Sequence, residues 1–169
     1  NIVYDALRMK LSHAWLMDDD SPTALGYAVM LRQWGKSAEQ LASEFEDDKF
    51  APAPISQDML TAFASRALSD APAHVQGDIP DWIETSFKAA FGDDWLRQAK
   101  ALNERPTLDL RANTLKASRT KVIKALEDAS AEATRIARQG VRIAAGEGPS
   151  RLPNVTAELS FQKGWFEVQ

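Results

Sequence analysis

Apolar residues recur at helical spacing through the first 75 residues of the chain. Segment 2–17 carries one such stripe, and three further stripes each begin just after a serine, namely Ser21, Ser37 and Ser56. Apolar side chains three and four positions apart lie on one face of a helix, and a serine hydroxyl accepts a hydrogen bond from a backbone N–H in the first helical turn. We therefore predict that residues 1–75 are all-α, with the apolar stripes facing a core.

A connector and further helices follow this region. Segment 71–80 contains two prolines and a glycine, a composition typical of a turn or a linker. After it, an apolar stripe that includes Trp82 and Phe91 predicts a helix ending at Gly92. We therefore expect residues 76–104 to form linker helices.

The pattern changes after Pro106. Residues 107–113 alternate between polar and apolar side chains, as expected of a strand with one buried face. Further features are predicted in this order: a helix capped by Ser118, strands at 133–137 and 141–144 joined by a turn at Gln139-Gly140, a weak helix, and a strand at 165–168. This β-α-β-β-α-β order is that of an RRM-like, or ferredoxin-like, fold. The predicted fold class is α+β, an all-α helical part followed by a small RRM-like α/β domain.

The composition excludes several kinds of chemistry. The chain has no cysteine and only two histidines, His13 and His74, so disulfides, zinc–thiolate sites and cysteine nucleophiles are ruled out and a metal site is not expected. No apolar run reaches the roughly 18 residues that a membrane span needs. Because the chain begins at Asn1, without a methionine and within a helical pattern, we expect it to be a fragment of a longer protein.

Charge is distributed unevenly along the chain, although its net value is only −4. Residues 1–100 hold 9 basic and 16 acidic side chains, residues 101–169 hold 11 and 8, and residues 105–142 hold 9 and 4. Such a concentration of lysine and arginine is what RNA phosphates require. On the predicted fold these basic residues cluster around one end of the sheet, and the alternative is a solvated helix face with ordinary surface charges.

The candidate RNA-binding residues bracket the strand predicted after Pro106. They are Arg105, Arg111, Asn113, Lys116, Arg119 and Lys121. Asn103 and Asn113 flank this strand, and an asparagine in that setting more often closes a turn or caps a helix than contacts a base. No aromatic pair occupies the strand, so base stacking of the usual RRM kind is not indicated. No catalytic set stands out, and the residues alone indicate a helical region followed by a small module with a candidate RNA interface.

Three stretches of the sequence resemble one known family. They are Ile79-Pro80-Asp81-Trp82-Ile83 with Phe91-Gly92, the run from Asn103 to Lys116, and the run from Gly164 to Gln169. The second stretch is the most specific, because it combines Arg105-Pro106 with Leu110-Arg111 and Asn113-Thr114-Leu115-Lys116, with Ala112 where the family more often has valine. Together these stretches resemble the Sun/RsmB-like family of bacterial ribosomal-RNA cytosine-5 methyltransferases.

The resemblance implies a partial NusB-like helical domain over 1–75, linker helices over 76–104 and an RRM-like RNA-binding domain over 105–169. It also implies that an S-adenosylmethionine-binding Rossmann domain follows in the full-length protein. Members of the family attack cytosine with a cysteine thiolate, which this chain does not have, so the chain alone is expected to have neither catalytic residues nor a cofactor. Its expected role is to position ribosomal RNA, as a cytoplasmic monomer without metal or membrane.

Two other functions stay open on the sequence. The chain could be a stand-alone RNA-binding or antitermination-type module, which the gene downstream of Gln169 would decide. It could also be a protein-interaction adaptor that uses the helical part, and RNA binding that weakens steeply with salt would decide against that function.

Overall fold

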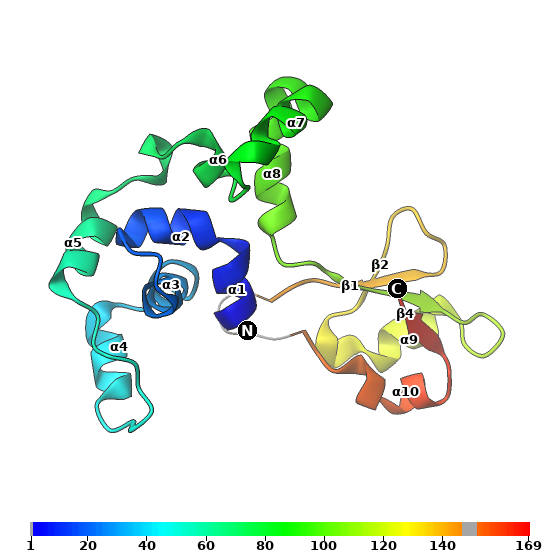
Figure 1. Cartoon of the computed structure of the whole chain (residues 1–169). Coiled ribbons are helices and arrows are strands. Elements are labelled where there is room, and N and C mark those ends of the chain that lie inside the picture. Colours follow the sequence, from blue (N-terminus) through cyan, green and yellow to red (C-terminus); the bar gives the residue numbers. More distant parts are fainter. Residues whose placement is uncertain (1, 147–151) are drawn as a thin grey trace. The chain divides into compact units, whose positions relative to one another are not determined.

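The computed structural model describes residues 2–146 and 152–169, which form two compact units (Figure 1). The first, called the helical unit here, comprises residues 2–104. The second, the sheet unit, comprises residues 105–146 and 152–169. Each unit has an apolar core of its own.

The helical unit contains only helices and connecting segments. Its α-helices are α1 (Ile2–Arg8), α2 (Lys10–Met17), α3 (Pro22–Ala28), α4 (Ala38–Phe45), α5 (Gln57–Ser65), α6 (Ala73–Gln76), α7 (Asp81–Phe91) and α8 (Trp95–Asn103). Three short helices of other types are η1 (Val29–Gln33, π-helical), η2 (Leu68–Asp70) and η3 (Gly92–Asp94).

The serine caps predicted from the sequence are confirmed. The hydroxyl oxygens of Ser21, Ser37 and Ser56 each accept a hydrogen bond from the backbone N–H three residues later, at 3.2 Å in every case. Ser37 forms a full capping box, because its own N–H donates to the side chain of Gln40 at 2.8 Å. These bonds satisfy N–H groups that the first turn of a helix leaves without a partner.

The single inward-facing helix predicted over residues 2–17 is wrong. The helix is interrupted at Met9, where φ is −119°, and α1 and α2 form on either side of it. In α1 two apolar residues of the stripe that was predicted to face the core, Val3 and Leu7, are 59% and 63% exposed, whereas Asp5 is buried. A periodic stripe identifies one face of a helix but does not say which element covers it.

Two apolar clusters hold the helical unit together. The larger lies among α2, α3, η1 and α4 and contains Met17, Ala24, Tyr27, Ala28, Met30 and Leu41. The smaller lies among the segment before α7 and helices α7 and α8, and its buried members are Ile79, Trp95 and Ala99. The stripe predicted on α7 is only partly inward, since Trp82 is 76% exposed.

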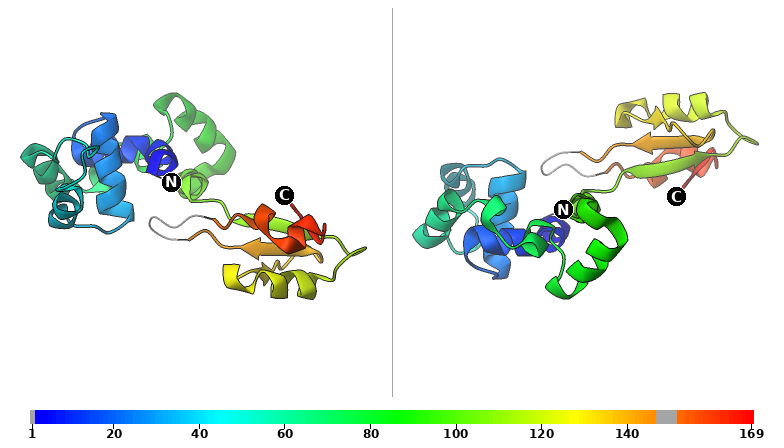
Figure 2. Two further views of the ribbon diagram at one scale, coloured as in Figure 1. Left: turned by 90° about the horizontal axis from the view of Figure 1, so that it is seen from below. Right: turned by 90° about the horizontal axis from the view of Figure 1, so that it is seen from above.

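The sheet unit contains four strands and two α-helices. In chain order its elements are β1 (Leu108–Ala112), α9 (Arg119–Ala125), η4 (Glu127–Ala129), β2 (Glu132–Ala133), β3 (Gly140–Ile143), η5 (Val155–Ala157), α10 (Leu159–Gln162) and β4 (Phe166–Val168). The strands pair antiparallel in the order β2-β3-β1-β4. Both helices lie on one face of the sheet (Figures 1 and 2). The predicted ferredoxin-like α+β architecture is confirmed.

Alternation along the strands explains why one face is covered and the other is not. Leu110 and Val141 point to the helices and are buried with Val122 of α9, while Arg111 and Arg142 point to the opposite, helix-free face. Successive side chains of a strand point to opposite faces, so the period-2 pattern read from the sequence divides the unit into core and surface.

The predicted hairpin between the second and third strands is wrong in its boundaries. β2 ends at Ala133, and residues 134–139 form a loop in place of a longer strand. Gly140, predicted in the turn, is the first residue of β3. The strand fails to continue because the hydroxyl of Thr134 donates to the carbonyl oxygen of Ala137 at 3.0 Å, which closes the loop on itself.

No helix of the described residues is long and apolar enough to cross a membrane. Within residues 2–146 and 152–169, no three His, Asp or Glu side chains meet where they could hold a metal ion.

Hydrogen bonds through the buried residue Ser12 join α2 to the segment before α7. The N–H of Ser12 donates to Asp78 Oδ1 at 2.8 Å, and Arg32 Nη1 donates to Ser12 Oγ at 3.0 Å. His13, the next residue, is fully buried. Its burial, and next the positive charge of Arg32, lower the pKa of His13 from 6.5 to about 4. His13 is therefore neutral in the folded protein at pH 7.

We expect the helical unit to lose stability as the pH falls from 7 to 5. In this range His13 becomes protonated in the unfolded state but stays neutral in the folded state, because its folded pKa of about 4 lies below the unfolded value of 6.5. The free energy of unfolding should fall by about 2 kcal/mol over that range, measured by urea denaturation followed by circular dichroism.

The variant His13→Gln should show a flatter pH dependence than the unsubstituted chain, and this difference separates His13 from Asp78, whose pKa is raised by burial. His74→Gln, which removes the more exposed histidine, is the matched control and should keep the full slope. Equal slopes in all three proteins would contradict the assignment.

Candidate nucleic-acid interface

Asn113 joins the end of β1 to the segment that leads into β4. Its N–H donates to the carbonyl oxygen of Trp165 at 2.8 Å, and its Nδ2 donates to that of Gly164 at 3.0 Å. Its Oδ1 accepts from the N–H of Leu115 at 3.2 Å, and its carbonyl oxygen accepts from the N–H of Lys116 at 2.9 Å. Asn113 therefore fixes the turn that presents Lys116.

Three lysines surround the Gly164-Trp165 dipeptide that Asn113 holds. Lys121 Nζ lies 4.1 Å from the centroid of the Trp165 ring, and Lys163 Nζ lies 5.6 Å from it. Lys116 lies against Gly164, where a Cβ atom would come within 2.9 Å of its Nζ. Gly164 also has φ +67°, a backbone conformation that favours glycine.

We call Lys116, Lys121, Lys163 and Trp165 the lysine corner. In the part of the chain that the structure describes, none of the three lysines has an ion-pair partner. An ammonium group over an aromatic face is attracted to the ring and keeps its other donors available. The lysine corner is thus a compact group of cations that can bind phosphate oxygens.

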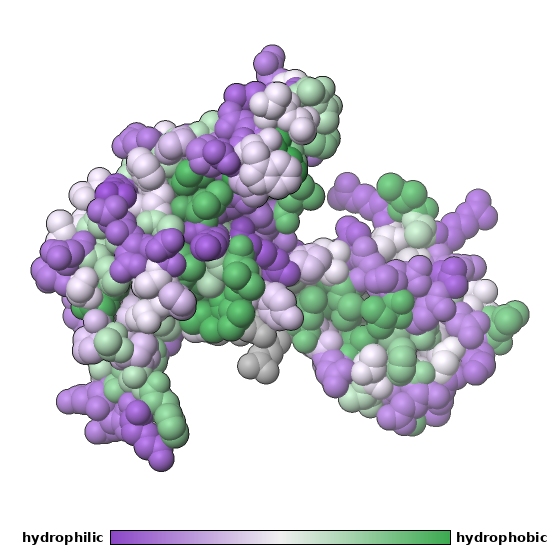
Figure 3. Space-filling model, in the orientation of Figure 1, coloured by the Kyte–Doolittle hydropathy of each residue, from purple (hydrophilic) through white to green (hydrophobic). Residues whose placement is uncertain are grey.

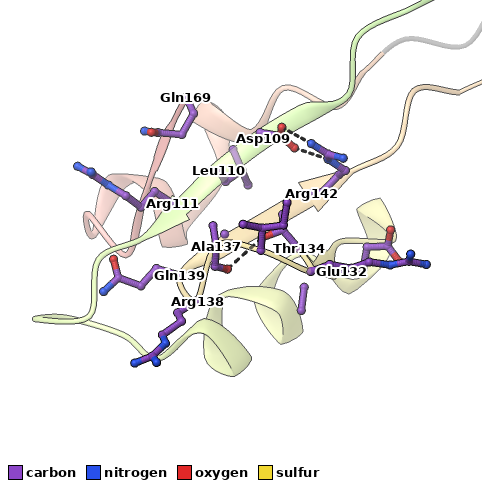
Figure 4. A pocket seen from close by; sticks show the side chains of 14 residues that line it. Asp109, Leu110, Arg111, Glu132, Thr134, Ala137, Arg138, Gln139, Arg142 and Gln169 are labelled. Carbon is purple, nitrogen blue, oxygen red and sulfur yellow. Dashed lines mark hydrogen bonds and ion pairs between the residues drawn. The ribbon is translucent and has the colours of Figure 1, made fainter.

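The arginines that strands β1 and β3 place on the helix-free face are, by contrast, already paired. Arg142 donates to Asp109 through two hydrogen bonds of 2.6 Å each, from the neighbouring strand (Figure 4). The hydrogen bonds from Arg142 hold the pKa of Asp109 below its usual range. Arg111 forms an ion pair with Glu167, which lies directly opposite on β4. Arg111 is therefore oriented by the sheet and partly neutralised.

The remaining predicted residues lie elsewhere. Arg105 precedes β1, and its Nη1 donates to the carbonyl oxygen of Gly146 at 3.1 Å. Arg119 begins α9 and donates to the carbonyl oxygen of Ala137 at 3.4 Å. Asn103 ends α8, where its Nδ2 donates to the carbonyl oxygens of Gly77 and Ala99 at 2.7 and 3.1 Å.

The prediction that all these cations gather at one end of the sheet is therefore wrong for Arg105. Arg105 precedes β1 and Lys116 follows it, so the two residues lie toward opposite ends of this strand. An extended strand rises about 3.3 Å per residue. The structure brings Lys116 and Lys121 together beside Asn113, sets Arg111 on the helix-free face and turns Arg119 toward the loop after β2. Whether any of the six contacts RNA stays a prediction.

Sequence reasoning missed two members of the lysine corner. Lys163 lies far from Lys121 in sequence, and Trp165 is predicted only as part of the strand at 165–168. Trp165 does pack against the core, but it is only half-buried and carries two lysines over its ring. The sequence signal was the run Lys163-Gly164-Trp165, a cation and an aromatic residue on either side of a glycine.

Comparison with known proteins connects this geometry to a family. A model described as the ferredoxin-like domain of RsmF/B-like methyltransferases matches residues 79–147. These residues belong to that domain family. The match includes α7 and α8 as well as the sheet unit up to β3, and it confirms the resemblance seen in the sequence.

The curated proteins to which this chain is similar include ones named as ribosomal-RNA methyltransferases. The chain is 33% identical over 97 residues to the probable ribosomal RNA small subunit methyltransferase B of Synechocystis, a match covering 56% of this chain and 21% of the relative. It is also 33% identical over 92 residues to the corresponding protein of Yersinia pseudotuberculosis, covering 53% and 20%. The matches thus span about a fifth of the length of these curated relatives and correspond to their N-terminal part.

A solved structure agrees with the fold. The crystal structure of PH0851 superposes with a TM-score of 0.60 at 20% identity, covering 99% of this chain and 43% of that one. At this identity the match supports the fold of the RsmF/B-like domain and its helical neighbour.

We expect Asn113→Ala to destabilise the sheet unit by about 1–3 kcal/mol, because it removes two side-chain hydrogen bonds at the junction of β1 and β4. Thr114→Ala is the matched control, since the neighbouring Thr114 makes no side-chain hydrogen bond with the described residues and should cost under about 0.5 kcal/mol. Urea denaturation of the two variants checks the difference. If both lose the same stability, Asn113 does not hold the turn.

Proposed function

We propose that the sheet unit binds ribosomal RNA and orients it for a cytosine-5 methyltransferase domain in the full-length protein. The observation that carries the proposal is the lysine corner, where three cations without ion-pair partners among the described residues are fixed around Gly164 and Trp165. Lysine binds backbone phosphates without reading the base sequence. The relatives named ribosomal RNA small subunit methyltransferase B support ribosomal RNA as the partner.

The methyl-transfer step belongs, in this proposal, to another part of the parent protein. The chain contains no cysteine, so it cannot supply a thiolate nucleophile. S-adenosylmethionine is accordingly proposed for the full-length protein, and no residue of this chain is assigned to it. The chain contributes binding energy and orientation, which lower the entropic cost of bringing a base to a catalytic site.

The organisation of the parent protein follows the same proposal. We infer that residues 1–75 are the later part of a NusB-like domain, that 76–104 link it to the RNA-binding part, and that 105–169 precede the catalytic domain. A cytoplasmic location and a monomeric state remain predictions within it.

One observation favours a second function, protein interaction through the helical unit. The exposed face of α1 carries Val3, Tyr4 and Leu7, each about 60% exposed. Neighbouring apolar side chains on a surface helix are a common feature of protein interfaces. Salt distinguishes the two functions, because an apolar interface is far less sensitive to ionic strength than phosphate binding is.

We expect the triple variant Lys116→Gln, Lys121→Gln, Lys163→Gln to bind single-stranded ribosomal-RNA oligonucleotides at least about tenfold more weakly at low salt. Loss of three phosphate contacts should also reduce the slope of log affinity against log salt by about 2. Fluorescence anisotropy between about 50 and 300 mM salt measures both quantities.

The matched control is Lys10→Gln, Lys49→Gln, Lys100→Gln, which removes the same charge from exposed positions of the helical unit. This control should lose much less affinity and keep the slope. Equal losses in the two triple variants would show that net charge, and not the lysine corner, determines binding.

A further inference from the structure

The loop between β2 and β3, residues 134–139, is closed by hydrogen bonds at its neck. The N–H of Thr134 donates to the carbonyl oxygen of Gly140 at 3.1 Å, and the N–H of Gly140 donates to that of Ala137 at 3.0 Å. The carbonyl oxygen of Ala137 also accepts from the Thr134 hydroxyl at 3.0 Å and from Arg119 Nη1 at 3.4 Å. The loop therefore has a defined shape.

Gly140 allows this closure. A Cβ atom at position 140 would lie 2.2 Å from the hydroxyl oxygen of Thr134 and 3.0 Å from the Cβ of Ala137, so a side chain there would open the neck. The loop rises on the side of the sheet opposite α9 and α10, and the Arg119 side chain at the start of α9 reaches it (Figure 1).

The tip of the loop combines an apolar side chain with two cations. Ile136 is 97% exposed, and Arg135 and Arg138 are exposed on either side of it without ion-pair partners among the described residues. The loop contains no acidic residue. Figure 3 shows an apolar tip between two hydrophilic projections at this place. A single exposed isoleucine needs no explanation. A closed loop that presents it between two arginines, however, can place the apolar side chain against a base step while the arginines contact phosphates.

A pocket of about 830 Å³ lies between the loop and the helix-free face. The loop contributes Ile136, Arg138 and Gln139 to its lining. Strands β1 and β3 contribute Asp109, Arg111 and Arg142, and Gln169 lines it just after β4 (Figure 4). Amide and guanidinium groups can hydrogen-bond the edges of a base, and a planar guanidinium can stack on its face in place of an aromatic ring. The volume lies within the range of pockets that hold small organic ligands, which includes a nucleotide.

We propose that this loop and pocket bind an unpaired nucleotide that bulges from an RNA stem. Ile136 contacts the exposed base step of the stem, Arg135 and Arg138 bind the flanking phosphates, and the unpaired nucleotide enters the pocket beside Arg111 and Gln139. This inference rests on the proposed function and deepens it, because it names the RNA feature that is recognised. The lysine corner then binds backbone phosphates, while the loop distinguishes a bulge from a continuous helix.

The test uses the full chain and two hairpin RNAs of equal length, one fully paired and one with a single bulged 2-aminopurine. We expect the chain to bind the bulged hairpin about tenfold more tightly than the paired one, with a change in 2-aminopurine fluorescence. Ile136→Ala should bring the two affinities within about twofold of each other and abolish the fluorescence change.

Leu115→Ala is the matched control, because Leu115 is 95% exposed in another loop of the same unit. This variant should keep both the preference and the fluorescence change. Both side chains are almost fully exposed, so neither truncation removes core packing, and thermal melting checks that both variants stay folded.

The outcomes separate this inference from the proposed function. If the chain binds both hairpins equally, or if Ile136→Ala and Leu115→Ala behave alike, the loop inference is overturned, and salt-dependent binding through the lysine corner still stands. If bulge preference depends on Ile136 while the lysine variants bind normally, the inference is supported and the lysine assignment is overturned. If the unsubstituted chain binds neither hairpin, both are overturned.

Discussion

The hydrogen bonds of Asn113 determine how the sheet unit presents its cations. One asparagine joins the end of β1 to Gly164 and Trp165 just before β4, and its backbone carbonyl forms the turn that carries Lys116. Without that junction, Lys116 and Lys163 belong to separate loops, whereas Trp165 keeps its packing against the core. Side chains held in place before binding lose less conformational freedom when a ligand arrives.

A net charge of −4 does not by itself argue against the anionic partner that we propose. Coulomb attraction between exposed groups is screened over about 10 Å at moderate ionic strength, so a phosphate responds to local charges more than to the total. The acidic residues lie mostly in the helical unit. Within the sheet unit, Arg111 and Arg142 are neutralised by strand neighbours, whereas the lysine corner and the β2–β3 loop keep their charge.

Local signals predicted much of the fold, and long-range ones were missed. The caps at Ser21, Ser37, Ser56 and Ser118 depend on residues three positions apart, so they could be read from the chain directly. The alternation of β1 revealed its buried face. By contrast, the role of Trp165 depends on a lysine 44 positions earlier. The hydrogen bond between Thr134 and Ala137 at the end of β2 is local, but it was not anticipated, because a threonine hydroxyl in a strand pattern does not reveal which carbonyl it will bond. The exposure of the apolar face of α1 was not predicted either, because helical spacing does not identify the element that covers a face.

Amide NMR of the full chain titrated with a single-stranded ribosomal-RNA oligonucleotide tests the central claim most directly. The account predicts that the largest shift changes fall on the amides of Lys116, Lys121 and Lys163 to Trp165, with a second group in residues 134–139. Changes confined to the helical unit, or none at RNA concentrations that saturate binding in solution, would contradict it.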